Sequence, residues 1–160
     1  MGGPLNVGVI GVGVISDQYF AQFPNLPGLR LAGVADLDTA RAASVADAQG
    51  TRALSVDELL ADPGIDAVLN LTIPAAHAEI ALRALDAGKH VYGEKPLALT
   101  TAQAAEVLAR AAETGLRVGS APDTVLGTGI QTARAVLDAT RSEGPRSDPG
   151  APPARRVERS

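Results

Sequence analysis

Residues 5–17 read Leu-Asn-Val-Gly-Val-Ile-Gly-Val-Gly-Val-Ile-Ser-Asp, and this stretch decides the fold. Its first part, through Ile10, is apolar and rich in β-branched residues, which is typical of a strand buried on both faces. The run ends in Gly11-Val12-Gly13, where a chain can turn tightly and bring bare backbone against a ligand. A helical pattern follows at once. A strand, a glycine turn and a helix in this order predict a dinucleotide-binding site.

Strand-like and helix-like patterns alternate along the rest of the chain. After the first strand, further strands are expected at 29–35, 52–54, 66–72, 90–93 and 117–119. The helices are expected at 15–23, 39–49, 55–61, 74–87, 101–114 and 128–140. Such alternation requires parallel strands joined by right-handed crossovers. The prediction is an α/β fold, a Rossmann doubly wound parallel sheet, whose ligands bind at the carboxyl ends of the strands.

The amino-acid composition argues against several classes of function and partner. Hydrophobic residues make up 46% of the chain but aromatic residues only 2%, so the core is expected to consist of Ala, Val, Leu and Ile. The net charge of −4 argues against nucleic acid or an anionic membrane as a partner. The absence of cysteine excludes disulfides and thiolate chemistry, and His77 and His90 alone do not suggest a metal site. No apolar run approaches the ~18 residues of a membrane span, so we expect a soluble, cytoplasmic protein.

The composition changes near residue 142. Residues 142–160 contain four prolines, many charges and few apolar side chains. Such a segment buries too little surface to offset the entropy of ordering, and disorder is expected. The predicted organisation is therefore a dinucleotide-binding domain at 1–123, a linker helix within 124–141 and a disordered tail at 142–160.

The glycine turn is expected to meet a pyrophosphate. The backbone N–H groups of Val12 to Val14 and the start of the following helix would face the phosphates. Ser16 stands where the third glycine of the fingerprint is usual, and a small residue there does not block such a site. A tight structural turn that binds nothing is the alternative.

Asp36 ends the second strand, about 20 residues after the glycines, where a carboxylate can accept both hydroxyls of a ribose. The alternative is a turn aspartate that caps the next helix, although Asp38 is the better cap. No cation adjoins Asp36 in the sequence, and Arg41 lies one turn away. NAD is therefore expected as the cofactor in preference to NADP.

Two further strand ends carry polar groups. Thr72-Ile73-Pro74 would face the nicotinamide side of the cleft, or form an ordinary strand-to-helix turn in which His77 is simply packed or capping. Glu94-Lys95-Pro96 places an anion and a cation at the same edge as Ser120. A lysine near a nicotinamide can orient a hydroxyl substrate or move its proton, whereas a surface ion pair would be the structural alternative.

The chain resembles the Gfo/Idh/MocA family, the group of glucose–fructose oxidoreductase and inositol dehydrogenase. The resemblance rests on residues 7–16, 34–36, 71–74 with His77, 87–98 and 119–127. The family implies a Rossmann domain that binds NAD or NADP, followed by a larger antiparallel sheet domain that holds the substrate. Family substrates are typically sugars, inositols and related polyols.

The resemblance also implies roles for single residues. Lys95 would be the catalytic-site lysine, the Lys95–Pro96 bond is expected to be cis, and no metal is implied. The Thr72, Pro74 and His77 side chains would line the nicotinamide side, and Glu94 would bind the nicotinamide ribose. The residues that would hold the pyrophosphate and the adenosine ribose are Gly11, Val12, Gly13, Val14, Ile15 and Asp36.

The resemblance ends inside the helix expected at 128–140. The family's second domain, with its catalytic Asp and His and most of the polyol-binding surface, has no counterpart in these residues. A natural short form, a shifted reading frame and a fragment would each produce this pattern. We therefore expect the nucleotide-binding half of an oxidoreductase, inactive unless a second domain is supplied. The alternatives are a stand-alone NAD-binding module, or a partner-dependent fragment that self-associates through Ile130, Ala133 and Leu137.

Overall fold

The computed structural model describes residues 3–122 and 127–142, which fall into two units, 1–121 and 122–160. The first unit contains the sheet and its helices. Within the second, the described element is α6 (Thr128–Ser142), on which Ile130 and Leu137 are exposed. The self-association proposed through this helix stays a prediction, and the tail expected beyond residue 142 lies outside the described residues.

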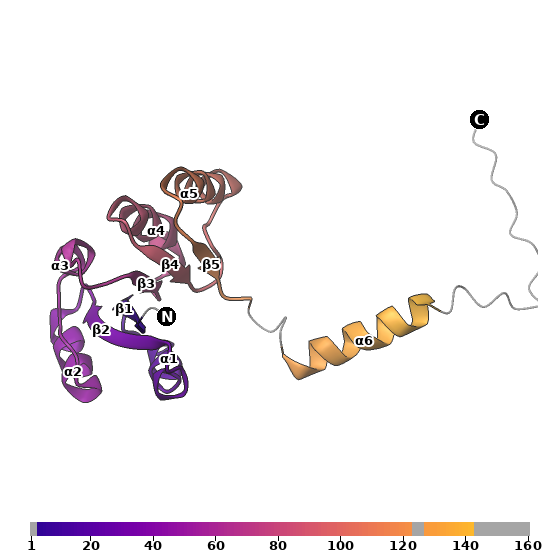
Figure 1. Ribbon diagram of the computed structural model, residues 1–160, viewed down its shortest axis with the longest axis horizontal. Coiled ribbons are helices and arrows are strands. Elements are labelled where there is room, and N and C mark those ends of the chain that lie inside the picture. The colour runs from indigo at the N-terminus through magenta and orange to yellow at the C-terminus, as the bar shows by residue number, and fades with distance from the viewer. Residues whose placement is uncertain (1–2, 123–126, 143–160) are drawn as a thin grey trace, which may run out of the picture. The chain divides into compact units, whose positions relative to one another are not determined.

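The sheet confirms the predicted Rossmann-like architecture (Figure 1). Its strands are all parallel and lie in the order β2-β1-β3-β4-β5. Because the connections leave the central strands in opposite directions, a crevice is expected at the carboxyl ends of β1 and β3. The strands are β1 (Leu5–Ile10), β2 (Leu29–Ala35), β3 (Ala67–Asn70), β4 (His90–Gly93) and β5 (Val118–Ser120).

The expected strand at 52–54 is only an isolated parallel bridge between Ala53 and Val34. Two backbone hydrogen bonds hold it, from the Val34 N–H to the Arg52 carbonyl and from the Leu54 N–H to the Val34 carbonyl. The segment therefore lies beside β2 as a sixth, incomplete member of the sheet. With it counted, the spatial order becomes the one described for Rossmann folds.

Helices cover both faces of the sheet (Figure 1). One apolar cluster joins α3, α4 and α5 to the sheet through side chains such as Leu59, Leu85 and Val107. The other joins α1 and α2 to it through Phe20 and Ala46. The helices are α1 (Ser16–Phe20), α2 (Thr39–Gln49), α3 (Val56–Ala61), α4 (His77–Asp86) and α5 (Thr101–Thr114), with short 3₁₀ turns η1 (Phe23–Asn25) and η2 (Pro74–Ala76).

Two predicted helices differ from the structure at their ends. The helix expected at 15–23 is α-helical only over Ser16–Phe20, because the Gln22 N–H bonds to the carbonyl of Tyr19 and the chain tightens into η1, which contains Pro24. The helix expected from Pro74 likewise begins as η2 and becomes α-helical at His77. The first difference arises where Pro24 lacks the N–H that would continue the helix, whereas Pro74 stands at the first position of η2, where no such donor is needed.

Lys89 is a buried cation that the sequence analysis missed. It is only 4% exposed, and its Nζ donates to the carbonyls of Asp62 and Ile65, each at 2.8 Å. These contacts fasten the loop before β3 to the turn that precedes β4.

Replacing Lys89 by methionine is expected to lower the free energy of unfolding by about 2 kcal/mol, because the Asp62 and Ile65 carbonyls lose their donor. Urea denaturation measures the change. Lys95→Met is the matched control, since Lys95 is exposed, and it should cost less than about 0.5 kcal/mol. Equal losses for the two variants would contradict a structural role for Lys89.

Candidate nucleotide-binding edge

The carboxyl ends of the strands meet in one row. Ile10 pairs with Ala35 on one side and with Asn70 on the other, and Asn70 pairs in turn with Gly93. The backbone ladder continues one residue further, from the Gly11 N–H to the Ala35 carbonyl and from the Glu94 N–H to the Asn70 carbonyl. The structure thus brings the predicted residues that follow β1, β2, β3 and β4 to the same edge.

The two glycines of the turn differ in what the fold demands of them. Gly11 has φ +92°, and a Cβ there would lie 2.7 Å from the backbone C and O of Leu71. Only glycine fits at this position. At Gly13 an added Cβ would meet no protein atom within 4 Å. The fold therefore requires Gly11 but leaves Gly13 facing open space.

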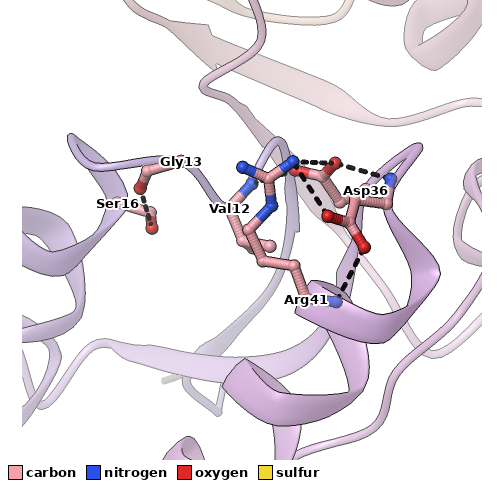
Figure 2. A network of polar contacts seen from close by, with 6 residues as sticks. Val12, Gly13, Ser16, Asp36 and Arg41 are labelled. Atoms are coloured by element: carbon pink, nitrogen blue, oxygen red, sulfur yellow. Dashed lines mark hydrogen bonds and ion pairs between the residues drawn. The ribbon is translucent and has the colours of Figure 1, made fainter.

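Asp36 ties the end of β2 to the glycine turn (Figure 2). Its Oδ2 accepts a 2.8 Å hydrogen bond from the Val12 N–H, and its Oδ1 accepts one of 2.9 Å from the Asp38 N–H. The Val12 amide, which was predicted to face the pyrophosphate, therefore faces this carboxylate. No local sequence signal predicts this contact, because the two residues are 24 positions apart.

Arg41 lies closer to Asp36 than the sequence analysis assumed. Its Nη2 is 3.4 Å from the Asp36 Oδ1 and 3.5 Å from the Asp38 Oδ2 (Figure 2). Asp38 also caps α2, since its side chain accepts from the Arg41 N–H, as the sequence predicted. A guanidinium thus accompanies the carboxylate that is proposed to bind the ribose.

Ser16 closes the glycine turn. It is buried, and its Oγ donates to the Gly13 carbonyl at 2.6 Å while its N–H bonds to the same oxygen (Figure 2). Where the fingerprint usually has its third glycine, Ser16 therefore stabilises the turn with two hydrogen bonds to the Gly13 carbonyl. Beside it, Val14 is 91% exposed and Ile15 is half-buried.

His77 lies beneath the edge, only 3% exposed. Its Nδ1 is 2.6 Å from the Pro96 carbonyl oxygen and its Nε2 is 3.0 Å from that of Thr72. A neutral ring donates to one of these oxygens, and a ring protonated at both nitrogens donates to both. The histidine thus joins the turns after β3 and β4, which agrees with the packed alternative. Its place beside a nicotinamide stays a prediction.

Asn70 fixes the same region from the end of β3. Its side-chain amide donates to the His77 carbonyl at 3.0 Å, and its Oδ1 accepts from the Thr72 hydroxyl at 2.7 Å. The sequence analysis treated Asn70 as part of a strand and assigned it no such function. Pro74, two residues after Thr72, is exposed at the start of η2.

Glu94 is held by two donors. Its Oε1 accepts a 2.6 Å hydrogen bond from the Tyr19 hydroxyl, and its Oε2 accepts one of 3.2 Å from the Lys95 N–H. Burial, together with the bond to Glu94, raises the pKa of Tyr19 well above its usual range, so the phenol stays protonated. Lys95 is exposed, and the Lys95–Pro96 bond is cis, as expected. Tyr19 escaped the sequence analysis because no local signal connects it to a residue 75 positions away.

The described residues contain neither a membrane-spanning helix nor a metal-binding cluster. No helix within 3–122 or 127–142 is long and apolar enough to cross a membrane. Among the His, Asp and Glu residues of the described part, no group of three could hold a metal ion.

The chain is similar to curated oxidoreductases. It is 38% identical over 117 residues to an uncharacterized oxidoreductase of Rhizobium meliloti, covering 71% of this chain and 35% of that protein. It is 30% identical over 118 residues to inositol 2-dehydrogenase of Salmonella typhimurium, again covering 71% of this chain and 35% of the enzyme. The chain therefore spans about a third of the length of these relatives.

Solved structures show the same architecture. Biliverdin reductase from Synechocystis sp. PCC 6803, in complex with biliverdin and NADP+, is 35% identical with a TM-score of 0.78, covering 84% of this chain and 43% of that one. A 3-ketoreductase from Actinomadura kijaniata, in complex with NADP and TDP-benzene, is 31% identical with a TM-score of 0.79, covering 85% of this chain and 42% of that one.

The sequence model of an oxidoreductase family with an NAD-binding Rossmann fold matches residues 5–121. The matched residues include the glycine turn, Asp36 and the Glu94-Lys95-Pro96 turn. The resemblance noted in the sequence is confirmed, and this chain belongs to the Gfo/Idh/MocA family of oxidoreductases.

Proposed function

We propose that this chain binds NAD at the carboxyl edge of its sheet and supplies the nucleotide-binding half of an oxidoreductase that acts on a sugar, an inositol or a related polyol. The observation that carries the proposal is the difference between the two glycines. Gly11 is explained by the fold, whereas Gly13, with no protein atom near its missing Cβ, is explained by close approach of a ligand.

Exposed apolar side chains at the same edge support a ligand with planar rings. Val14, Leu37 and Ile73 follow β1, β2 and β3 respectively, and they are 91%, 98% and 70% exposed. These side chains follow three neighbouring strands and are available to pack against the rings of a bound ligand. The polyol part of the proposal rests on similarity to inositol 2-dehydrogenase, and on the family.

The residues of the edge suit the parts of NAD. The Val12 N–H already donates to Asp36. The pyrophosphate would therefore contact the backbone around Gly13, Val14 and Ile15. Asp36 Oδ1 accepts from the Asp38 N–H and the Arg41 guanidinium, whereas Oδ2, among the described residues, accepts only from the Val12 N–H and retains a lone pair for a ribose hydroxyl. On the nicotinamide side, Thr72, Pro74 and His77 would shape the turn after β3, and Glu94 would accept from the second ribose.

Lys95 is the proposed catalytic residue. Bound NAD would supply the hydride acceptor. The neutral Lys95 amine would accept the proton of the substrate hydroxyl, and the ammonium so formed would donate a hydrogen bond to the same oxygen. These 160 residues span about a third of the length of the curated relatives, and by family resemblance a further domain would hold the substrate. Tested alone, they are therefore expected to bind NAD without steady-state NADH formation from polyols.

Calorimetric titration of NAD and NADP into the full chain tests the proposal. We expect one NAD to bind per chain, and more tightly than NADP. Failure of both nucleotides to bind at millimolar concentration would contradict the proposed function. Sustained NADH formation from a polyol would contradict the expected dependence on a second domain.

The choice of NAD over NADP is proposed to depend on the charge of Asp36, since a 2′-phosphate would approach this carboxylate and be repelled. Arg41 offsets part of that repulsion, which leaves NADP a weaker ligand rather than an excluded one. Asp36→Asn is expected to lower the ratio of NAD to NADP affinity by about tenfold, or ~1.4 kcal/mol.

Asp38→Asn is the matched control, because it removes the same charge from a more exposed side chain and asparagine still caps α2. Its affinity ratio should change by less than about threefold. An equal change in the two variants would mean that general charge, and not Asp36, selects the cofactor.

A further inference from the structure

We propose that Tyr19 is a positioning residue, which holds the Glu94 carboxylate in the orientation that receives the nicotinamide-side ribose. The inference rests on the proposed function, because it assigns a support to one part of the same site. Tyr19 lies on α1, whereas the Glu94-Lys95-Pro96 motif, which carries the family resemblance on the nicotinamide side, lies after β4.

The contacts of Glu94 leave its side chain little freedom. The Tyr19 hydroxyl donates to Oε1 at 2.6 Å and the Lys95 N–H donates to Oε2 at 3.2 Å, so each oxygen has a donor. The backbone is fixed as well, since the Glu94 N–H bonds to the Asn70 carbonyl at 3.0 Å. Two of these three bonds join Glu94 to the ends of β3 and β4, and the third comes from Tyr19 on α1.

Tyr19 is suited to act as a permanent donor. Its burial and its bond to Glu94 raise the pKa of the phenol, so the hydroxyl keeps its proton at neutral pH. A charge-assisted bond of 2.6 Å is also among the stronger hydrogen bonds of a protein. The Tyr19 hydroxyl is therefore a hydrogen-bond donor to Glu94 at neutral pH.

The bond connects the two ends of the proposed cofactor site. At the start of α1, Ser16 bonds to the Gly13 carbonyl of the glycine turn. At its last turn, Tyr19 bonds to Glu94. The short helix α1 thus joins the turn proposed for the pyrophosphate to the carboxylate proposed for the second ribose.

Loss of the hydroxyl is therefore expected to weaken ligands that contain the second ribose and to spare those that do not. NAD contains that ribose and ADP lacks it, while both contain the adenosine and the diphosphate. A general loosening of α1 would instead weaken NAD and ADP alike, because α1 adjoins the glycine turn.

Tyr19→Phe in the full chain tests the inference by calorimetry with NAD and ADP. The phenyl ring keeps its packing against the apolar cluster of α1 and β1. We expect the dissociation constant of NAD to rise by about fivefold to tenfold and that of ADP to change by less than about twofold. Tyr92→Phe is the control: among the described residues, the Glu94 carboxylate accepts from the Tyr19 hydroxyl and the Lys95 N–H and not from Tyr92, so neither constant should change.

A second variant shows whether Tyr19 acts through Glu94. In a Glu94→Ala background, Tyr19→Phe should change the NAD dissociation constant by less than about twofold. An unchanged NAD constant in the single variant, equal weakening of NAD and ADP, or a full further loss in the Glu94→Ala background would each overturn the inference. If the wild-type chain binds neither NAD nor ADP, the proposed function itself fails.

Discussion

Replacing Gly13 by alanine should weaken NAD binding by about tenfold to 100-fold, or ~1–3 kcal/mol, without weakening the fold. The added methyl group would meet no protein atom within 4 Å, so the folded chain has room for it. A ligand packed against the turn would not. Calorimetry measures the loss of binding, and urea denaturation measures stability.

The stability of this variant should stay the same or rise slightly, since alanine restricts the unfolded chain more than glycine does. NAD binding equal to that of the wild type would show that no ligand approaches Gly13. The proposed function would then lose the observation that carries it.

Replacing Gly11 by alanine, unlike the Gly13 substitution, should lower the stability of the fold, by about 3 kcal/mol or more. The backbone at φ +92° is unfavourable for any residue with a Cβ, and that Cβ would lie 2.7 Å from backbone atoms of Leu71. The resulting shift would separate the turn from β3. Urea denaturation of the Gly11→Ala and Gly13→Ala variants compares the same substitution at positions two residues apart.

Similar stabilities for the two variants would contradict the division of the turn into a structural glycine and a ligand-facing glycine. The comparison needs no ligand, so it tests the geometry of the turn independently of the cofactor.

Local sequence patterns predict the bounds of a helix correctly where capping residues stand at both of its ends. The ranges expected for α2 and α5 match the structure at both ends, because Asp38 and Thr100 cap their starts and Gly50 and Gly115, both left-handed, end them. The expected range of β2 is also confirmed. These signals lie within a few residues of the boundaries that they set.

Contacts between distant residues could not be predicted in this way. Asp36 bonds to the Val12 amide, and Tyr19 bonds to Glu94, across 24 and 75 residues respectively. The sequence analysis correctly predicted that these strand ends would meet, because parallel strands place their carboxyl ends at one edge. Local patterns do not indicate which donor meets which acceptor, since that depends on how the turns after β1 and β2 meet and on how α1 packs against the sheet.

In the proposed function, a dinucleotide binds across the carboxyl edge of the sheet, beside Gly13. The most direct measurement is an amide correlation NMR spectrum of the full chain, recorded during titration with NAD. We expect the largest shifts at the amides of Gly13, Leu37 and Lys95, with amides at the opposite edge, such as that of Arg117, unchanged. Shifts confined to that opposite edge, or no shifts at saturating NAD, would contradict the claim.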